Sequence, residues 1–207
     1  MGDGAGDELA PYRLDQAFGH AGLRREMPDL CDHILDPRLI VDGVAALLDL
    51  GRMQRNIDTM QSRMNALGVK LRPHVKTSKC VEVVRRQVAA GASGITVSTL
   101  KEAEQFFAAG FRDVLYAVGM VPVKLMQVQA LRDRDCDLKI IVDSVDAAQA
   151  IVTFGRERQH VFEVWLEIDT DGHRAGLKPE GGELLAVGRT LHEGGMTLGG
   201  VMTHAGG

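Results

Sequence analysis

The sequence predicts an α/β protein built as an incomplete (β/α)8 barrel of the TIM type, with about six of the eight strands present. Strand-like apolar runs alternate with helical stretches over short connections, which is typical of parallel β/α units. No such run is followed by the GxGxxG turn of a dinucleotide-binding sheet. The 207 residues, of which 45% are hydrophobic, suffice for the buried core of one domain.

Composition excludes several classes of function. With 24 basic and 28 acidic side chains the net charge is −4, and aromatic residues make up 4%, whereas a nucleic-acid surface needs clustered Lys and Arg with stacking rings. No apolar run approaches the roughly 20 residues of a membrane helix, and the acidic, glycine-rich start Met1–Glu8 is unlike a signal peptide. Three cysteines without CxxC spacing (Cys31, Cys80, Cys136) suit a reducing compartment, so we expect a cytoplasmic protein.

Two regions are expected along the chain. Residues 1–36 contain few apolar periods and several turn formers, and they are predicted to form a loosely structured arm with one short helix around Arg13–Ala21. The partial barrel is predicted over residues 37–207. Its first helix follows the apolar run Val44–Leu50 and stops at Gly68. One face of this helix carries five apolar residues that we interpret as core: Met53, Ile57, Met60, Met64 and Leu67.

The later helices carry local start and stop signals. Thr99 and Glu102 form a capping box, and Gly110 ends that helix. Ser144 caps the next, and residues 183–193 place apolar side chains on one face. Six strand-like runs separate the helical stretches: Val69–Val75, Gly94–Val97, Asp113–Val118, Leu138–Val142, Val161–Ile168 and Leu198–Thr203.

The end of the sequence leads us to expect the front part of a longer polypeptide. The chain stops at Val201–Gly207, directly after a strand-like run, where a loop into another helix is expected. A barrel that lacks two strands has edge strands with unpaired backbone groups, and it exposes apolar surface. We therefore expect the 207 residues alone to be inactive.

The stretch Leu71–Lys79 is the most informative for chemistry. Strand alternation places Arg72, His74 and Lys76 on one face, which in a barrel points inward, with Lys76 at the strand's carboxyl end, where barrel active sites lie. A partly desolvated lysine beside other cations has a lowered pKa and is suited to capture an aldehyde as a Schiff base. The alternative, a polar edge strand with solvated basic groups, stays open on spacing alone.

A second polar stretch follows the fifth run. Glu163, Trp165, Glu167 and Asp169 are expected on the inward face, where their carboxylates could balance the inward basic groups. The loop after them carries Arg174, whose guanidinium can hold a phenolate or carboxylate. A calcium loop is rejected, because Arg174 occupies the sixth position, where that loop needs glycine.

His204 follows the last run at the expected barrel mouth. A lone histidine is often structural, and both a structural and a catalytic role stay open for it. The other histidines considered have no ligand-like spacing and no zinc pattern is present; they are treated as surface or structural: His20, His33, His160 and His192.

Together these stretches resemble the fold type III pyridoxal-phosphate enzymes, whose barrel is of the alanine racemase N-terminal type, and most of all the branch with D-threonine aldolases and D-serine dehydratases. Arg72-Pro-His-Val-Lys-Thr-Ser-Lys79 looks like the Arg-Pro-His-x-Lys-Thr motif of that branch. Ile95–Glu104 resembles its next βα unit, Ile168–Gly176 its arginine loop, and Thr203–Gly207 the segment beside the pyridine ring.

The resemblance implies a pyridoxal 5'-phosphate-dependent lyase acting on β-hydroxy D-amino acids. In it Lys76 forms the Schiff base with the cofactor, Arg174 contacts the ring oxygen, and His204 is a catalytic and cofactor-binding residue. The motif adds His74 and Arg72 as candidate cofactor-binding residues. An amino-acid racemase of the same fold, or a non-catalytic cofactor-binding protein, remains an alternative.

The resemblance also implies parts that this sequence lacks. Most phosphate-binding groups, a C-terminal β-domain and the ligands of a divalent metal are expected beyond residue 207, so no metal ligand is assigned here. A small D-amino acid is the expected partner, and a homodimer is possible for the full-length protein.

Overall fold

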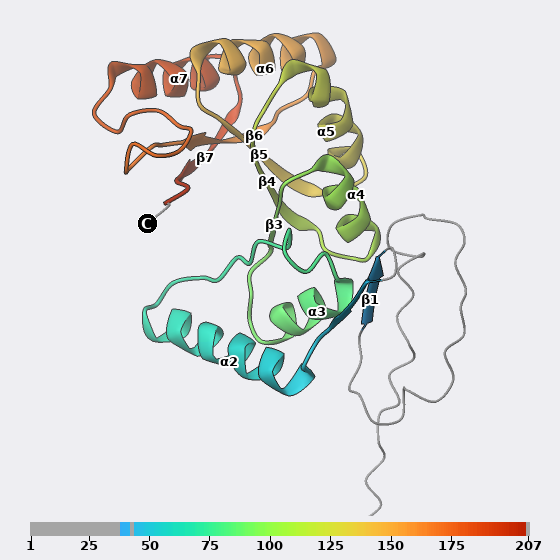
Figure 1. Ribbon diagram of the computed structural model, residues 1–207. Coiled ribbons are helices and arrows are strands. Elements are labelled where there is room, and N and C mark those ends of the chain that lie inside the picture. Colours follow the sequence, from blue (N-terminus) through green and yellow to red (C-terminus); the bar gives the residue numbers. More distant parts are fainter. Residues whose placement is uncertain (1–37, 42–43, 206–207) are drawn as a thin grey trace, which may run out of the picture.

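A computed structural model describes residues 38–41 and 44–205 (Figure 1). The predicted arm over residues 1–36, with its short helix, lies outside the described residues. The first described element is an antiparallel pair of strands, β1 (Arg38–Val41) and β2 (Val44–Leu47), which the sequence pattern does not predict.

A five-stranded parallel sheet forms the centre of the fold. Its strands lie side by side in chain order, as they do in a barrel wall. The order confirms the predicted succession of parallel β/α units. The strands are β3 (Ile95–Val97), β4 (Asp113–Gly119), β5 (Asp137–Val142), β6 (Glu163–Glu167) and β7 (Thr197–Met202).

Helices cover one face of this sheet. Figure 1 shows α4 to α7 following one another along that face. They form a continuous core with alternate strand residues such as Ile95, Tyr116 and Val164, which are fully buried. The helices are α3 (Val81–Ala89), α4 (Leu100–Ala108), α5 (Leu125–Arg132), preceded by the 3-10 turn η1 (Pro122–Lys124), α6 (Val145–Arg158) and α7 (Gly182–Glu193).

The opposite face, here called the inner face, carries a smaller cluster made of strand residues alone. Leu115, Ala117 and Ile141 are buried there, with Trp165 and Met202 packed against them. The polar residues on the strands alternate with the helix-side core residues, so they lie on this inner face. In β6 the division agrees with the predicted one, because Val164 and Leu166 lie in the helix-side core whereas Trp165 packs on the inner face.

Local capping signals are also confirmed. The N–H of Glu102 donates to Thr99 Oγ1 (3.0 Å) at the start of α4, and the N–H of Ala147 donates to Ser144 Oγ (3.3 Å) at the start of α6. Gly110 follows α4 with a φ of +100°, a conformation that favours glycine.

The predicted helix after Leu50 is found as α2 (Leu50–Ala66), but its predicted core face is only partly correct. Ile57 is buried, whereas Met60 is 49% exposed and Leu67 64% exposed. The buried position one turn after Ile57 is the polar Gln61. The methionine stripe is therefore not a continuous core face, because Ile57 and Gln61 are the buried residues of α2.

The predicted strand Val69–Val75 is wrong as a regular strand, although the chain there does lie along β3. Leu71 and Pro73 accept hydrogen bonds from Ser93 and Thr96, and the N–H of Val75 donates to Thr96. Only an isolated parallel bridge, His74 to Thr96, results. Pro73 has no N–H to donate, which interrupts the ladder.

Candidate active site

Lys76 lies where this segment leaves the sheet. Val75 before it is buried in the helix-side core, whereas Lys76 is exposed. A turn follows, closed by the N–H of Lys79, which donates to the carbonyl of Val75 (2.9 Å). Within the described residues no carboxylate forms an ion pair with the Lys76 ammonium. Lys76 therefore presents an amine that is not engaged by an acidic group there.

His74, two residues before Lys76, contacts the backbone of Lys76. The backbone N–H of Lys76 donates to His74 Nδ1 (3.3 Å), so this nitrogen carries no proton. The proton of the neutral ring is then on Nε2, which lies 3.2 Å from Ser98 Oγ. Burial lowers the pKa of His74, and the nearby charge of Lys76 lowers it further. His74 is thus a neutral, oriented ring beside the amine.

Ser98 and Glu102 connect this region to the start of α4. The N–H of Ser98 donates to Glu102 Oε2 (2.8 Å), and Lys79 Nζ lies 3.0 Å from Glu102 Oε1. Burial alone would raise the pKa of Glu102, but the hydrogen bonds from Ser98 and Lys79 outweigh it and hold the pKa below its usual value. Glu102 is therefore a buried carboxylate that stays ionised.

His204 lies at the end of β7 and pairs with β6. Its Nδ1 donates to Glu167 Oε1 (3.0 Å), and the Glu167 side chain is only 5% exposed. Burial and Lys76 lower the pKa of His74 most and His204 contributes least, so the two histidines lie within electrostatic range of each other. Glu167 thereby fixes the ring of His204 and leaves its Nε2 for another partner.

Arg174 lies in the loop between β6 and α7. The loop is closed at its base by a bridge between Ile168 and Leu177, and Gly176 has a φ of +131° there, with a Cβ position 2.6 Å from the backbone N of Asp169. Only glycine fits that closure without strain. Arg174 itself is exposed, and the structure shows no contact between it and Lys76.

Arg72 lies at the other edge of the inner face, where the strands begin. Its Nη2 is 2.7 Å from Asp113 Oδ2, and Lys139 Nζ lies 2.7 Å from Asp113 Oδ1 and 2.6 Å from Asp137 Oδ2. Burial alone would raise the pKa of Asp113, yet the bonds from Arg72 and Lys139 hold it below its usual value. Arg72 is thus apart from the other predicted site residues, which lie at the carboxyl edge.

The inward carboxylates of β6 have other partners than those predicted. Glu163 accepts from Trp165 Nε1 (3.0 Å), and Glu167 accepts from His204. The acidic partners of Arg72 and Lys139 come from the starts of β4 and β5 instead. The expectation that β6 balances Arg72 is therefore wrong, because β6 lies several strands away from that side chain.

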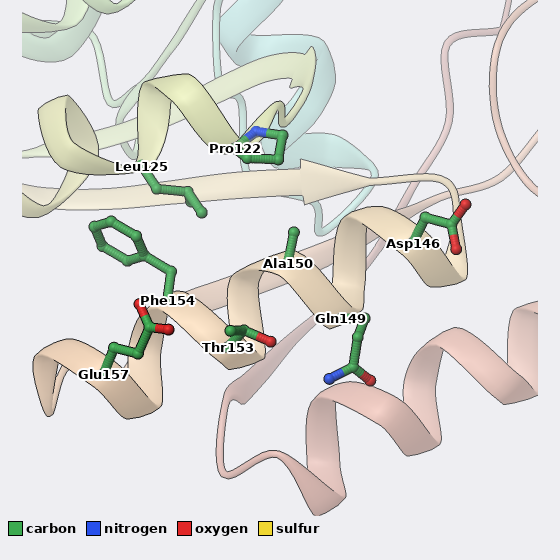
Figure 2. A pocket seen from close by; sticks show the side chains of 8 residues that line it. All are labelled: Pro122, Leu125, Asp146, Gln149, Ala150, Thr153, Phe154 and Glu157. Carbon is green, nitrogen blue, oxygen red and sulfur yellow. The ribbon is translucent and has the colours of Figure 1, made fainter.

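A shallow cavity lies on the helix-covered side, away from Lys76. It has a volume of about 410 Å³, and Figure 2 shows its lining on α6 together with η1 and α5. Apolar side chains such as Leu125 and Phe154 meet acidic ones such as Asp146 and Glu157 there. It contains no residue of the predicted site.

Sequence reasoning missed the partners that orient the site. The missed contacts join segments that are far apart in the chain, and they involve Ser98, Glu167 and the Glu102–Lys79 pair, all beside predicted residues.

Among the described residues no three His, Cys, Asp or Glu side chains gather as a metal site. In the same part of the chain, no helix is both long and apolar enough to span a bilayer.

Known proteins share this sequence and fold. The D-threo-3-hydroxyaspartate dehydratase of Delftia sp. (strain HT23) is 67% identical over 172 residues, which are 83% of this chain and 45% of that protein. The D-threonine aldolase of Arthrobacter sp. is 33% identical over 150 residues, 70% of this chain and 38% of that protein. The solved Delftia structure matches with a TM-score of 0.75 at 69% identity, over 76% of this chain and 42% of that one. A mutant of the same enzyme has been solved in a form described as metal-free.

The chain thus spans less than half the length of these relatives. Residues 48–207 match the family model for the alanine racemase N-terminal domain. The strand order seen here agrees with an incomplete barrel of that type. Because the match extends over more than half of its residues, the chain belongs to the alanine racemase N-terminal domain family.

Proposed function

We propose that this chain is the cofactor-binding part of a pyridoxal-phosphate-dependent lyase that acts on β-hydroxy D-amino acids. The proposal rests on the exposure and position of the Lys76 amine. It is an exposed amine without an acidic partner among residues 38–41 and 44–205, and it lies at the carboxyl edge of a barrel sheet beside a neutral histidine. The dehydratase and aldolase relatives support the reaction class.

The residues present fit the cofactor by their chemistry. Pyridoxal phosphate offers an aldehyde to an amine, and an acidic ring oxygen to a guanidinium. Lys76 would hold the aldehyde carbon, and Arg174 and His204 would bind the ring. When bound, the cofactor withdraws electrons from the bonds of the substrate's α-carbon.

The chain's own side chains prepare these contacts. His74, held neutral between the Lys76 amide and Ser98, adds no second positive charge beside the amine. Glu167 keeps the proton of His204 on Nδ1, so that Nε2 can hold or accept a proton at the open face of the site. The closed base of the 168–177 loop limits where Arg174 can move.

Arg72 has a different part in the proposal. The sequence assigned it to the cofactor, but its guanidinium is engaged by Asp113 and by the carbonyl of Ile95 (3.3 Å). We propose that it orders the segment leading to Lys76 and does not touch the cofactor.

The test is chemical trapping. We expect the complete polypeptide with pyridoxal phosphate to show a visible imine band that borohydride abolishes, and peptide mass spectrometry to place the reduced label on Lys76. Lys79, three residues away and paired with Glu102, is the internal control and should stay unlabelled. A label on another lysine, or no imine band, would contradict the proposal.

Substrate assays separate the alternatives. A dehydratase releases ammonia and a keto acid from D-threo-3-hydroxyaspartate or D-serine, an aldolase releases glycine and an aldehyde from D-threonine, and a racemase only removes optical activity. A cofactor-binding protein without turnover would show the imine and no product.

Three further parts belong to the same proposal. A divalent metal, held by ligands outside the described residues, would polarise the substrate's β-hydroxyl. The complete polypeptide would form a homodimer, which sedimentation would detect. A reducing, cytoplasmic location accords with the free thiols of Cys80 and Cys136.

A further inference from the structure

We propose that Glu102 and Lys79 are positioning residues, whose ion pair fixes the turn 75–79 that presents Lys76. The proposal rests on the proposed function only for the role of Lys76. In this proposal the start of α4, and not the sheet alone, holds the Lys76 amine in position.

The first observation is the backbone of Lys79. Its φ is +46°, in the left-handed region that residues with a side chain rarely adopt. Such a conformation persists only where the surroundings hold it. Here the N–H of Lys79 closes the turn on Val75, and its side chain reaches Glu102. The chain is thus held in an unfavoured conformation three residues after Lys76.

The second observation is the burial of Glu102. Its side chain is 5% exposed, whereas that of Lys79 is 50% exposed. A carboxylate buried to this extent needs strong partners. Its short contacts are to the ammonium of Lys79 at 3.0 Å and to the N–H of Ser98 at 2.8 Å. Loss of Lys79 would leave the carboxylate undercompensated.

The third observation concerns the other side of Lys76. His74 is tied to Ser98, and Lys79 is tied to Glu102. Both flanks of Lys76 are therefore bound to the five residues 98–102. The segment before Lys76 has few ladder hydrogen bonds because of Pro73, so side-chain contacts have to supply the missing restraint.

The alternative is that Glu102 only caps α4 and that its ion pair with Lys79 has no effect on the turn. Two substitutions distinguish these roles. In Glu102→Gln the amide oxygen can still accept from Ser98 and preserve the cap, while the ion pair is lost. Lys79→Met removes the charge from the other side and leaves the cap untouched. Both should loosen the turn if the ion pair holds it.

The experiment is hydrogen–deuterium exchange of the full chain, read on a peptide covering residues 75–80. We expect exchange at the Lys79 amide to be roughly tenfold faster in Glu102→Gln and in Lys79→Met, with β4 and β5 unchanged. Lys79→Arg should restore protection. Imine formation with pyridoxal phosphate should slow about tenfold or more in the two disruptive variants.

The matched control is Glu104→Gln, which removes an exposed ion pair with Lys101 on the same helix and should leave the turn unchanged. Unchanged exchange at residues 75–80 in Glu102→Gln and Lys79→Met would overturn the inference, as would an equal rise throughout the sheet. If the wild type forms no imine, the proposed function is wrong, while the exchange result still decides the role of this ion pair.

Discussion

The two edges of the inner face hold their charged groups in opposite ways. At the amino edge, Arg72, Lys139, Asp113 and Asp137 form what we call the amino-edge cluster, in which each charge has a partner of opposite sign. At the carboxyl edge, Lys76 has no acidic partner in the described part of the chain. Its neighbour His74 is held by an amide and a hydroxyl.

The charged groups at the amino edge stabilise the sheet, whereas Lys76 at the carboxyl edge stays available for chemistry. A closed cluster of paired charges restrains strands but has nothing left for a ligand. An amine beside a neutral ring adds little to stability, and it stays available for a carbonyl compound. The same segment, residues 72–76, carries one group of each kind, so a short stretch joins the anchored edge to the reactive one.

The largest effect should come from Lys76→Met in the complete polypeptide. Turnover and the imine band should be abolished, because no amine remains at that position. The free energy of unfolding should stay within about 0.5 kcal/mol of wild type, since Lys76 is exposed and forms no ion pair among the described residues. Enzyme assay and denaturant unfolding check the two halves, and a large loss of stability would mean that Lys76 is a structural residue.

Gly94→Ala should produce the largest loss of stability. Gly94 has a φ of +141°, and an added Cβ would press against Arg72 Nη1 and lie 2.5 Å from Asp113 Oδ2. Backbone strain and the disturbed ion pair together should lower the free energy of unfolding by about 3 kcal/mol. Urea unfolding measures it. Gly110→Ala, whose Cβ would meet nothing within 4 Å although its φ is also positive, isolates the contribution of strain alone.

Local signals explain what could be predicted from the sequence. The strands Asp113–Gly119 and Asp137–Val142, and the caps at Thr99 and Ser144, are encoded within a few residues of themselves. Lys76 is expected at the carboxyl edge because it directly follows the apolar run Val69–Val75, and alternation with Val75 gives the face on which it lies. These features need no knowledge of distant partners.

Partners across the sheet could not be predicted in this way. Arg72 and Asp113 are 41 residues apart, and His204 and Glu167 are 37 apart. Which carboxylate meets which base depends on strand register and on the position of each residue along its strand. Glu102 illustrates the limit: its role in the helix cap is local and was predictable, whereas its ion pair with Lys79 required the tertiary fold.

Lys139→Met provides the matched lysine substitution at the amino edge. The side chain of Lys139 is 10% exposed, and its loss leaves Asp137 without its ammonium partner and Asp113 with Arg72 alone. Breaking a fully buried pair typically costs about 3–5 kcal/mol, and since both carboxylates are partly exposed we expect about 2 kcal/mol. Imine formation should be retained in the folded protein. Loss of the imine without loss of stability would contradict the separation of the two edges.

The smallest effect should be a shift of stability with pH at the carboxyl edge. Burial, followed by the charge of Lys76, lowers the pKa of His74 below its ordinary value of 6.5. The unfolded chain then binds this proton more readily than the folded chain. The contribution of His74 to the free energy of unfolding is therefore complete above pH 6.5 and is lost as the pH falls through the lowered pKa. Comparison of wild type with His74→Asn by urea unfolding at a series of pH values isolates it. The gap between the two proteins should narrow on acidification below pH 6.5, whereas a constant gap would mean that His74 titrates alike in both states.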